Sequence, residues 1–151
     1  MKKITLKNFE VQNIVNLLSA QDSILNNRSD NKMPISLLWN IDKNFEKLNK
    51  INENILKMRR DIEQGYLSDE YSYDNKDENG NIVGRQIKQE YIPEFTSKIN
   101  ELMILDNEID IATISLSKLD DFSVDGHTLQ SIKFMIEDDT EKSDVVEGTV
   151  E

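Results

Sequence analysis

The side chains that most often perform catalysis are scarce in this chain. It has 151 residues, no cysteine and a single histidine, His127. A catalytic triad would need this histidine as its base, and no serine near it has the sequence context of a nucleophile elbow. Without cysteine, the chain also has no thiolate ligand for a metal and no disulfide. We therefore expect His127 to be an exposed residue in the first turn of a helix, and we predict a protein that is not an enzyme.

One polar stretch comes closest to a metal-binding motif. Asn75, Asp77, Asn79 and Gly80 match positions 1, 3, 5 and 6 of a calcium-binding loop. Position 12 is Gln86 instead of the glutamate that holds the ion with both oxygens, and the flanking residues favour strands over helices. We interpret the stretch as a hairpin turn, and we expect neither a metal ion nor another cofactor.

Charged side chains are abundant, but their arrangement does not single out a site. Adjacent carboxylates, as at Asp120 and Asp121, are expected by chance in a chain with 29 acidic residues. Arg59 and Arg60 lie in a locally basic stretch, yet acidic residues alternate with the basic ones at spacings that give ion pairs within a helix. The net charge of -11 would repel a nucleic-acid backbone. We predict no nucleic-acid binding.

The negative charge is concentrated at the C-terminal end. Residues 137–151 contain seven acidic residues and one basic residue, so they carry more than half of the net charge. This stretch is too polar to bury itself. We predict one domain over residues 1–136, followed by a disordered acidic tail over residues 137–151.

A long amphipathic helix after Pro34 is the strongest pattern in the sequence. Proline is tolerated in the first turn of a helix, and Gly65 marks either its end or a weak point near it. Apolar residues advance by three or four positions throughout, as in a helix with one buried face: Leu38, Ile41, Phe45, Leu48, Ile51, Ile55, Met58, Ile62 and Tyr66.

Shorter elements surround this helix. We predict a strand over residues 3–6, then a helix that Asn8 caps and that continues through Leu25 into the polar run 26–31. Asn79-Gly80 between β-favouring residues predicts a hairpin, and Pro93 opens a third helix that returns antiparallel to the long one. Residues 109–119 are expected to pair with the first strand, and a last helix, capped by Asp125 or Ser123, carries four apolar residues: Leu129, Ile132, Met135 and Ile136.

These elements predict an α+β fold that is predominantly helical. Its centre is a long antiparallel helix pair capped by a β-hairpin, with a small terminal strand pairing and a C-terminal helix. No segment approaches the roughly 20 apolar residues of a membrane span, and no signal peptide is visible. We expect no membrane association and a location in the cytoplasm of a bacterial host cell.

Aromatic residues are the best candidates for a binding surface, because amphipathic rings supply much of the energy at protein interfaces. The candidates are Trp39, Tyr66, Tyr71, Tyr73 and Tyr91. The alternative for each of them is packing in the core.

Several segments, taken in order, resemble a family of small proteins of unknown function encoded by phages and prophages of Gram-positive bacteria. The matching segments are Ile4-Thr5-Leu6-Lys7-Asn8, Val15-Asn16-Leu17-Leu18, Pro34-Ile35-Ser36, Asn44-Phe45-Glu46-Lys47-Leu48, Glu78-Asn79-Gly80-Asn81, Phe95, Asn100-Glu101-Leu102, Glu108-Ile109 and Phe134-Met135-Ile136. The resemblance extends to about residue 137. It implies a phage origin but transfers no site residue, because the family has no established activity.

Three classes of function are left open. The first is a phage-encoded module that binds and inhibits or adapts a host protein, for example a component of antiviral defence. The second is a factor for virion or tail assembly, or a minor structural component. The third, which the lack of catalytic residues disfavours, is an enzyme or small-ligand binder. The partner is expected to be a bacterial or phage protein, and the long apolar stripe makes a homodimer a further expectation.

Overall fold

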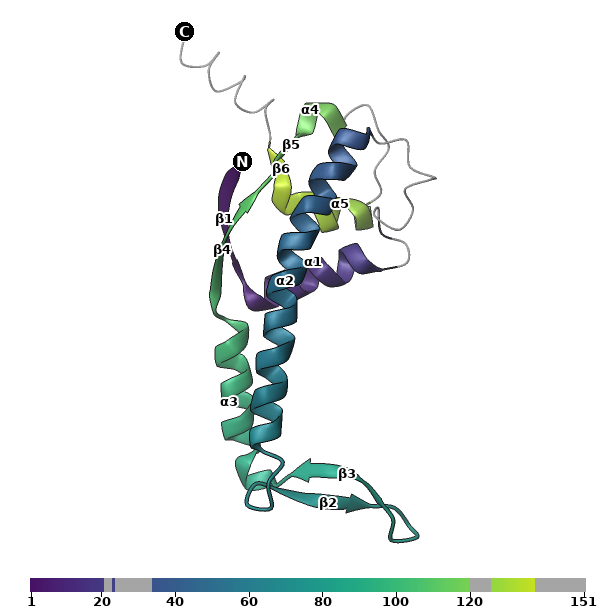
Figure 1. Ribbon diagram of the computed structural model, residues 1–151, viewed down its shortest axis with the longest axis vertical. Coiled ribbons are helices and arrows are strands. Elements are labelled where there is room, and N and C mark those ends of the chain that lie inside the picture. The colour runs from purple at the N-terminus through teal and green to yellow at the C-terminus, as the bar shows by residue number, and fades with distance from the viewer. Residues whose placement is uncertain (21–22, 24–33, 120–125, 138–151) are drawn as a thin grey trace.

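Helices and three short strand pairs make up the fold, as seen in a computed structural model that describes residues 1–20, 23, 34–119 and 126–137 (Figure 1). The predicted α+β class with predominant helix is confirmed. In chain order the elements are β1 (Lys2–Lys7), α1 (Asn8–Ser19), α2 (Ile35–Gly65), β2 (Ser72–Lys76), β3 (Ile82–Ile87), η2 (Gln89–Tyr91), α3 (Ile92–Met103), β4 (Asp106–Ile111), β5 (Ile114–Ser115), α4 (Leu116–Leu119), α5 (Gly126–Ile132), η3 (Lys133–Met135) and β6 (Ile136–Glu137).

The long helix pair and its hairpin follow the prediction. Helix α2 begins directly after Pro34 and ends at Gly65, which makes it about 46 Å long at 1.5 Å per residue. Helix α3 is less than half as long and returns alongside the C-terminal half of α2 (Figure 1). The β2–β3 hairpin lies at the far end of this pair. The N-terminal half of α2 is therefore left to pack on the rest of the chain.

The core lies around that N-terminal half. The most deeply buried positions of α2 are Leu37, Ile41, Asn44, Leu48 and Ile55, which advance by three, four or seven residues along one face. Other members of the predicted stripe, including Phe45 and Ile51, pack against this core while half-buried. The partners of the α2 face come from the terminal elements: Leu6, Val11, Val15, Leu18, Leu102, Ile109, Ile111, Ile114, Ile132 and Met135.

Strand β1 pairs with β4, but the prediction that residues 109–119 make this pairing was wrong in extent: only 109–111 belong to β4, while 114–115 pair with β6 and 116–119 form α4. Strands β1 and β4 are antiparallel, with Lys2 opposite Ile111 and Lys7 opposite Asp106. The last pair adds an ion pair of 3.2 Å between the Lys7 Nζ and an Asp106 carboxylate oxygen. Strand β4 runs directly on from α3, so the sheet joins the N-terminus to the end of the helix pair.

The prediction for the first helix was wrong at both ends. Asn8 does not cap α1, because Lys7 takes that position and its backbone N–H donates to the Glu10 carboxylate at 3.0 Å. The helix also stops at Ser19, because Ala20 is extended and its carbonyl accepts a hydrogen bond from the Ser23 N–H at 3.0 Å. Leu25 and the polar run 26–31 lie outside the described residues.

The last predicted helix is shorter than expected. Helix α5 ends at Ile132, Met135 lies in the 3₁₀ turn η3, and Ile136 pairs in parallel with Ile114 of β5. To pair with β5, residue 136 takes an extended backbone conformation, and the helix cannot continue through it. The proposed caps at 123 and 125 and residues 138–151 of the predicted tail lie outside the described residues, as does the side chain of His127.

Candidate functional site

The part of the helix pair beyond the core is thin and projects away from it. We call residues 56–101 the arm, since they lie between the buried Ile55 and Leu102. Within the arm only Tyr66 and Ser72 are buried, and every other residue is exposed or half-buried. The arm therefore presents most of its side chains to solvent, and its end carries the β2–β3 hairpin (Figure 1).

The hairpin turn is built by Asp77 and Gly80. One Asp77 carboxylate oxygen accepts hydrogen bonds from the backbone N–H groups of Asn79 and Asn81, both at 2.9 Å. Gly80 has a φ of 81°, which glycine adopts without steric cost. Strands flank the turn on both sides, as the hairpin interpretation predicted and unlike a calcium-binding loop. Within the described residues, no three His, Cys, Asp or Glu side chains are grouped so that they could hold a metal ion.

Arg85 links the two strands of the hairpin and ties them to the turn that follows α2. Its Nε donates to the Ser72 hydroxyl at 2.9 Å, and Nη1 donates to the Asp74 carboxylate at 2.9 Å. Nη2 donates to the Asp69 carboxylate at 3.0 Å and to the Ser72 carbonyl at 3.1 Å. Sequence reasoning missed this residue. The available signal was a lone arginine among acidic residues, facing Asp74 once the strands are aligned.

A bulge places apolar side chains at the hairpin surface. Asn75 is opposite Gly84 and Lys76 is opposite Ile82, so Val83 is an extra residue on β3. Ile82 and Val83 are 63% and 61% exposed. Tyr73, on β2, is also exposed. The hairpin thus carries three large apolar side chains that the described residues leave exposed.

Four aromatic rings join the hairpin to the helix pair. Tyr66 makes edge-to-face contacts with Tyr71 and Phe95, with ring centroids 5.2 and 5.4 Å apart. Tyr71 contacts Tyr91 in the same way at 4.8 Å. Three of the five predicted tyrosine and tryptophan candidates are therefore brought together. Phe95 of α3 joins them, although it was not among the predicted candidates.

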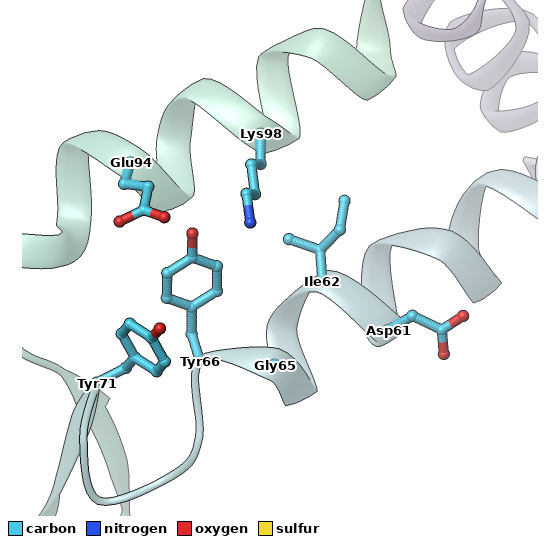
Figure 2. Close-up of a pocket in the computed structure, with 7 residues that line it drawn as sticks. All are labelled: Asp61, Ile62, Gly65, Tyr66, Tyr71, Glu94 and Lys98. Carbon is cyan, nitrogen blue, oxygen red and sulfur yellow. The ribbon is translucent and has the colours of Figure 1, made fainter.

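A pocket of about 180 Å³ opens beside Tyr66 (Figure 2). The Tyr66 side chain is 4% exposed, and its hydroxyl has no hydrogen-bond partner. The hydroxyl points toward the gap between Glu94 and Lys98, and the Lys98 ammonium lies 5.3 Å from the centre of the Tyr66 ring. The pocket is lined by Asp61, Ile62, Gly65, Tyr66, Tyr71, Glu94 and Lys98.

The surroundings of Tyr66 and Tyr91 disfavour their ionised forms. Burial raises the pKa of Tyr66, and the Glu94 carboxylate raises it further, while Lys98 opposes the change. Burial also raises the pKa of Tyr91, with Glu90 adding to the effect. Both phenols are consequently neutral near pH 7 and available as hydrogen-bond donors and acceptors.

Trp39, the fifth candidate, lies far from this cluster. It is 59% exposed near the N-terminal end of α2, with the Lys43 ammonium 5.2 Å from its ring centre. The 27 residues between Trp39 and Tyr66 correspond to about 40 Å of helix. One compact partner surface therefore cannot be centred on both.

Comparison with known protein families, with characterised proteins and with solved structures found no match to this chain. Among the residues that the structure describes, no helix combines the length and the apolar character needed to cross a membrane. Helix α2 has the length, but charged residues interrupt its sequence throughout.

Proposed function

We propose that this chain is a phage-encoded protein-binding module, without catalytic activity, that acts in the host cytoplasm. In this proposal it binds a bacterial host protein through the end of the arm and inhibits it or adapts it to another protein. The observation that carries the proposal is the exposure of Tyr73, Ile82 and Val83 on a hairpin at the end of a projecting helix pair. Exposed apolar side chains that gather on one element are typical of protein interaction sites.

The way the hairpin is held supports this function. An isolated two-stranded hairpin is at best marginally stable in water. Here the Arg85 hydrogen bonds hold the hairpin to the turn after α2, and the aromatic cluster of Tyr66, Tyr71, Tyr91 and Phe95 attaches its base to the helices. A surface that is already ordered loses less conformational entropy on binding. The anchored hairpin therefore suits recognition better than a mobile loop of the same composition would.

The charge at the end of the arm indicates what kind of partner it would bind. The whole arm, residues 56–101, contains ten acidic and seven basic residues, and the part toward the hairpin, residues 61–98, contains nine acidic and four basic ones. An acidic surface attracts a basic protein surface during encounter and repels the phosphates of a nucleic acid. The proposed partner surface is accordingly basic around an apolar centre.

The test is affinity capture with the tagged chain from uninfected and phage-infected host lysates, followed by mass spectrometry. A double variant, Ile82→Thr with Val83→Thr, keeps β-branched side chains and removes the apolar surface of the hairpin. Ile35→Thr makes the same chemical change at an exposed position on the opposite end of α2. We expect the original chain and the Ile35→Thr control to capture one host protein from uninfected lysate, and the double variant to lose it.

Other outcomes would contradict the proposal. Recovery of virion proteins alone, and only after infection, would indicate an assembly role instead of a host target. Capture that survives the double variant but is lost in Trp39→Ala would move the contact to the other end of α2. A pure chain that elutes as a dimer and captures nothing would indicate self-association.

A further inference from the structure

We infer that the pocket beside Tyr66 receives a single arginine or lysine side chain of the partner protein. This inference rests on the proposed protein-binding function and names the chemistry of one contact within it. The pocket volume of about 180 Å³ is below the roughly 300–1,000 Å³ of sites for small molecules and cofactors. It suits one amino-acid side chain.

The unpaired Tyr66 hydroxyl is the first indication of a missing ligand. Buried polar groups nearly always have a hydrogen-bond partner, because leaving one unpaired costs free energy. The Tyr66 hydroxyl is buried and faces the pocket between Glu94 and Lys98, and neither of them makes a hydrogen bond of good geometry to it. Its oxygen can accept a hydrogen bond from a guanidinium or ammonium group. A cationic side chain in the pocket would supply the partner that the free protein lacks.

The charges and rings around the pocket favour a cation over an anion. Glu94 points at the Tyr66 hydroxyl and Lys98 lies beside it, whereas the Asp61 carboxylate points away from the ring (Figure 2). The rings of Tyr66 and Tyr71 add π faces, which attract cations. A phosphate or carboxylate ligand would instead meet the Glu94 carboxylate and the negative faces of the rings.

Lys98 shows where the cation would sit. Its ammonium already lies 5.3 Å from the Tyr66 ring centre and close to Glu94 in the view of Figure 2. Lys98 is exposed, and its long side chain can turn into solvent. An incoming arginine can then take the same position and also donate to the Tyr66 oxygen and the Glu94 carboxylate in a forked geometry.

The test is a titration of the ¹⁵N-labelled chain, followed by NMR, with an acetylated and amidated Gly-Gly-Arg-Gly-Gly peptide. A peptide with citrulline in place of arginine keeps the shape and removes the charge. We expect the arginine peptide to shift the amide signals of the pocket residues with a Kd in the millimolar range, as suits one side chain. The citrulline peptide should leave them unchanged.

Two variants and one control locate the contact. Glu94→Gln should raise the Kd for the arginine peptide by about threefold to tenfold. Glu101→Gln removes the same charge further along α3, outside the pocket lining, and should leave binding unchanged. Tyr66→Phe removes only the hydroxyl, so it should weaken binding by about threefold while raising the melting temperature of the free chain.

The outcomes separate this inference from the proposed function. Amide shifts of equal size with the citrulline peptide would show that the pocket does not recognise a cation. An equal loss of affinity for the arginine peptide in Glu94→Gln and Glu101→Gln would show the same. A partner captured equally well by the original chain and Glu94→Gln would refute the pocket contact and leave the protein-binding function standing. Arginine binding by a chain that captures no protein would refute the function alone.

Discussion

Asn44 is the buried polar residue whose replacement tests the packing of the core most directly. Its Nδ2 donates to the Ala112 carbonyl at 2.8 Å, and its Oδ1 accepts from the Ala112 N–H at 2.8 Å. Nδ2 also lies 3.4 Å from the Met135 sulfur. The Asn44 side chain thus completes the backbone hydrogen bonding of the residue between β4 and β5. Replacing it with alanine leaves both Ala112 groups without these partners.

The expected destabilisation follows from these contacts. A hydrogen bond lost with its partner left unpaired costs about 1–3 kcal/mol, and the half-buried Ala112 places both losses in the lower part of that range. Alanine regains about 0.7 kcal/mol or less through its higher helix propensity. We therefore expect Asn44→Ala to lower the free energy of unfolding by about 1.5–2.5 kcal/mol, and the melting temperature by about 3–10 °C.

Urea denaturation followed by circular dichroism measures this change. Asn54→Ala is the matched control, since it makes the same substitution at an exposed position of α2. The control should raise stability by about 0.7 kcal/mol or less, through helix propensity alone. A loss in Asn44→Ala of less than about 1 kcal/mol relative to this control would refute the idea that the Asn44 side chain holds the strands to α2.

Two further predictions concern the arm. Arg85→Ala removes the contacts that hold the two strands together and to the turn after α2, and because its carboxylate partners are exposed we expect a local loss of about 1–2 kcal/mol. Amides of β2 and β3 should then exchange with solvent about 5–30-fold faster, and equal acceleration in the core would contradict a local role. The raised pKa values of Tyr66 and Tyr91 mean that the folded chain retains protons which the unfolded chain loses above pH about 10. The contribution of the two neutral phenols to the free energy of unfolding is therefore complete below that pH and falls as pH rises through the folded pKa values. The urea midpoint should consequently decrease between pH 8 and 10.5, and this decrease should be smaller in Tyr66→Phe than in the original chain. An equal decrease in both would contradict the assignment to Tyr66.

The helix pair and hairpin were predictable because their signals are local. The period of apolar residues after Pro34 defines α2 up to Gly65, and Asn79-Gly80 defines the turn. The start of the first helix was less predictable, because asparagine is a common helix N-cap but the Asn8 side chain makes its hydrogen bonds outside this helix. Its Nδ2 donates to the Leu102 carbonyl at 2.6 Å, and its Oδ1 accepts from the Asn107 side chain at 2.7 Å. Contacts over more than 90 residues decide its role, and no local pattern contains them.

The candidate site was predictable in its residue types but not in its grouping. Aromatic composition indicated Trp39 and Tyr66 equally, whereas the helix between them separates the two by about 40 Å. The partners of Arg85 depend on the strand register, which the extra residue Val83 shifts. The pocket depends on how α3 lies against α2, since Glu94 and Lys98 come from one helix and Tyr66 follows the other.

The pairing of β1 with β4 has a consequence for the order of folding. Lys2 and Ile111 are partners although more than 100 residues separate them, while the arm forms from contacts within residues 56–101. Contacts that are distant in sequence form slowly, because closing the intervening loop costs entropy. During synthesis the first strand must wait, with its backbone unpaired, until β4 has left the ribosome. The arm can be complete by then. We therefore expect the arm, which we propose binds the partner, to fold before the β1–β4 sheet and the core beside it.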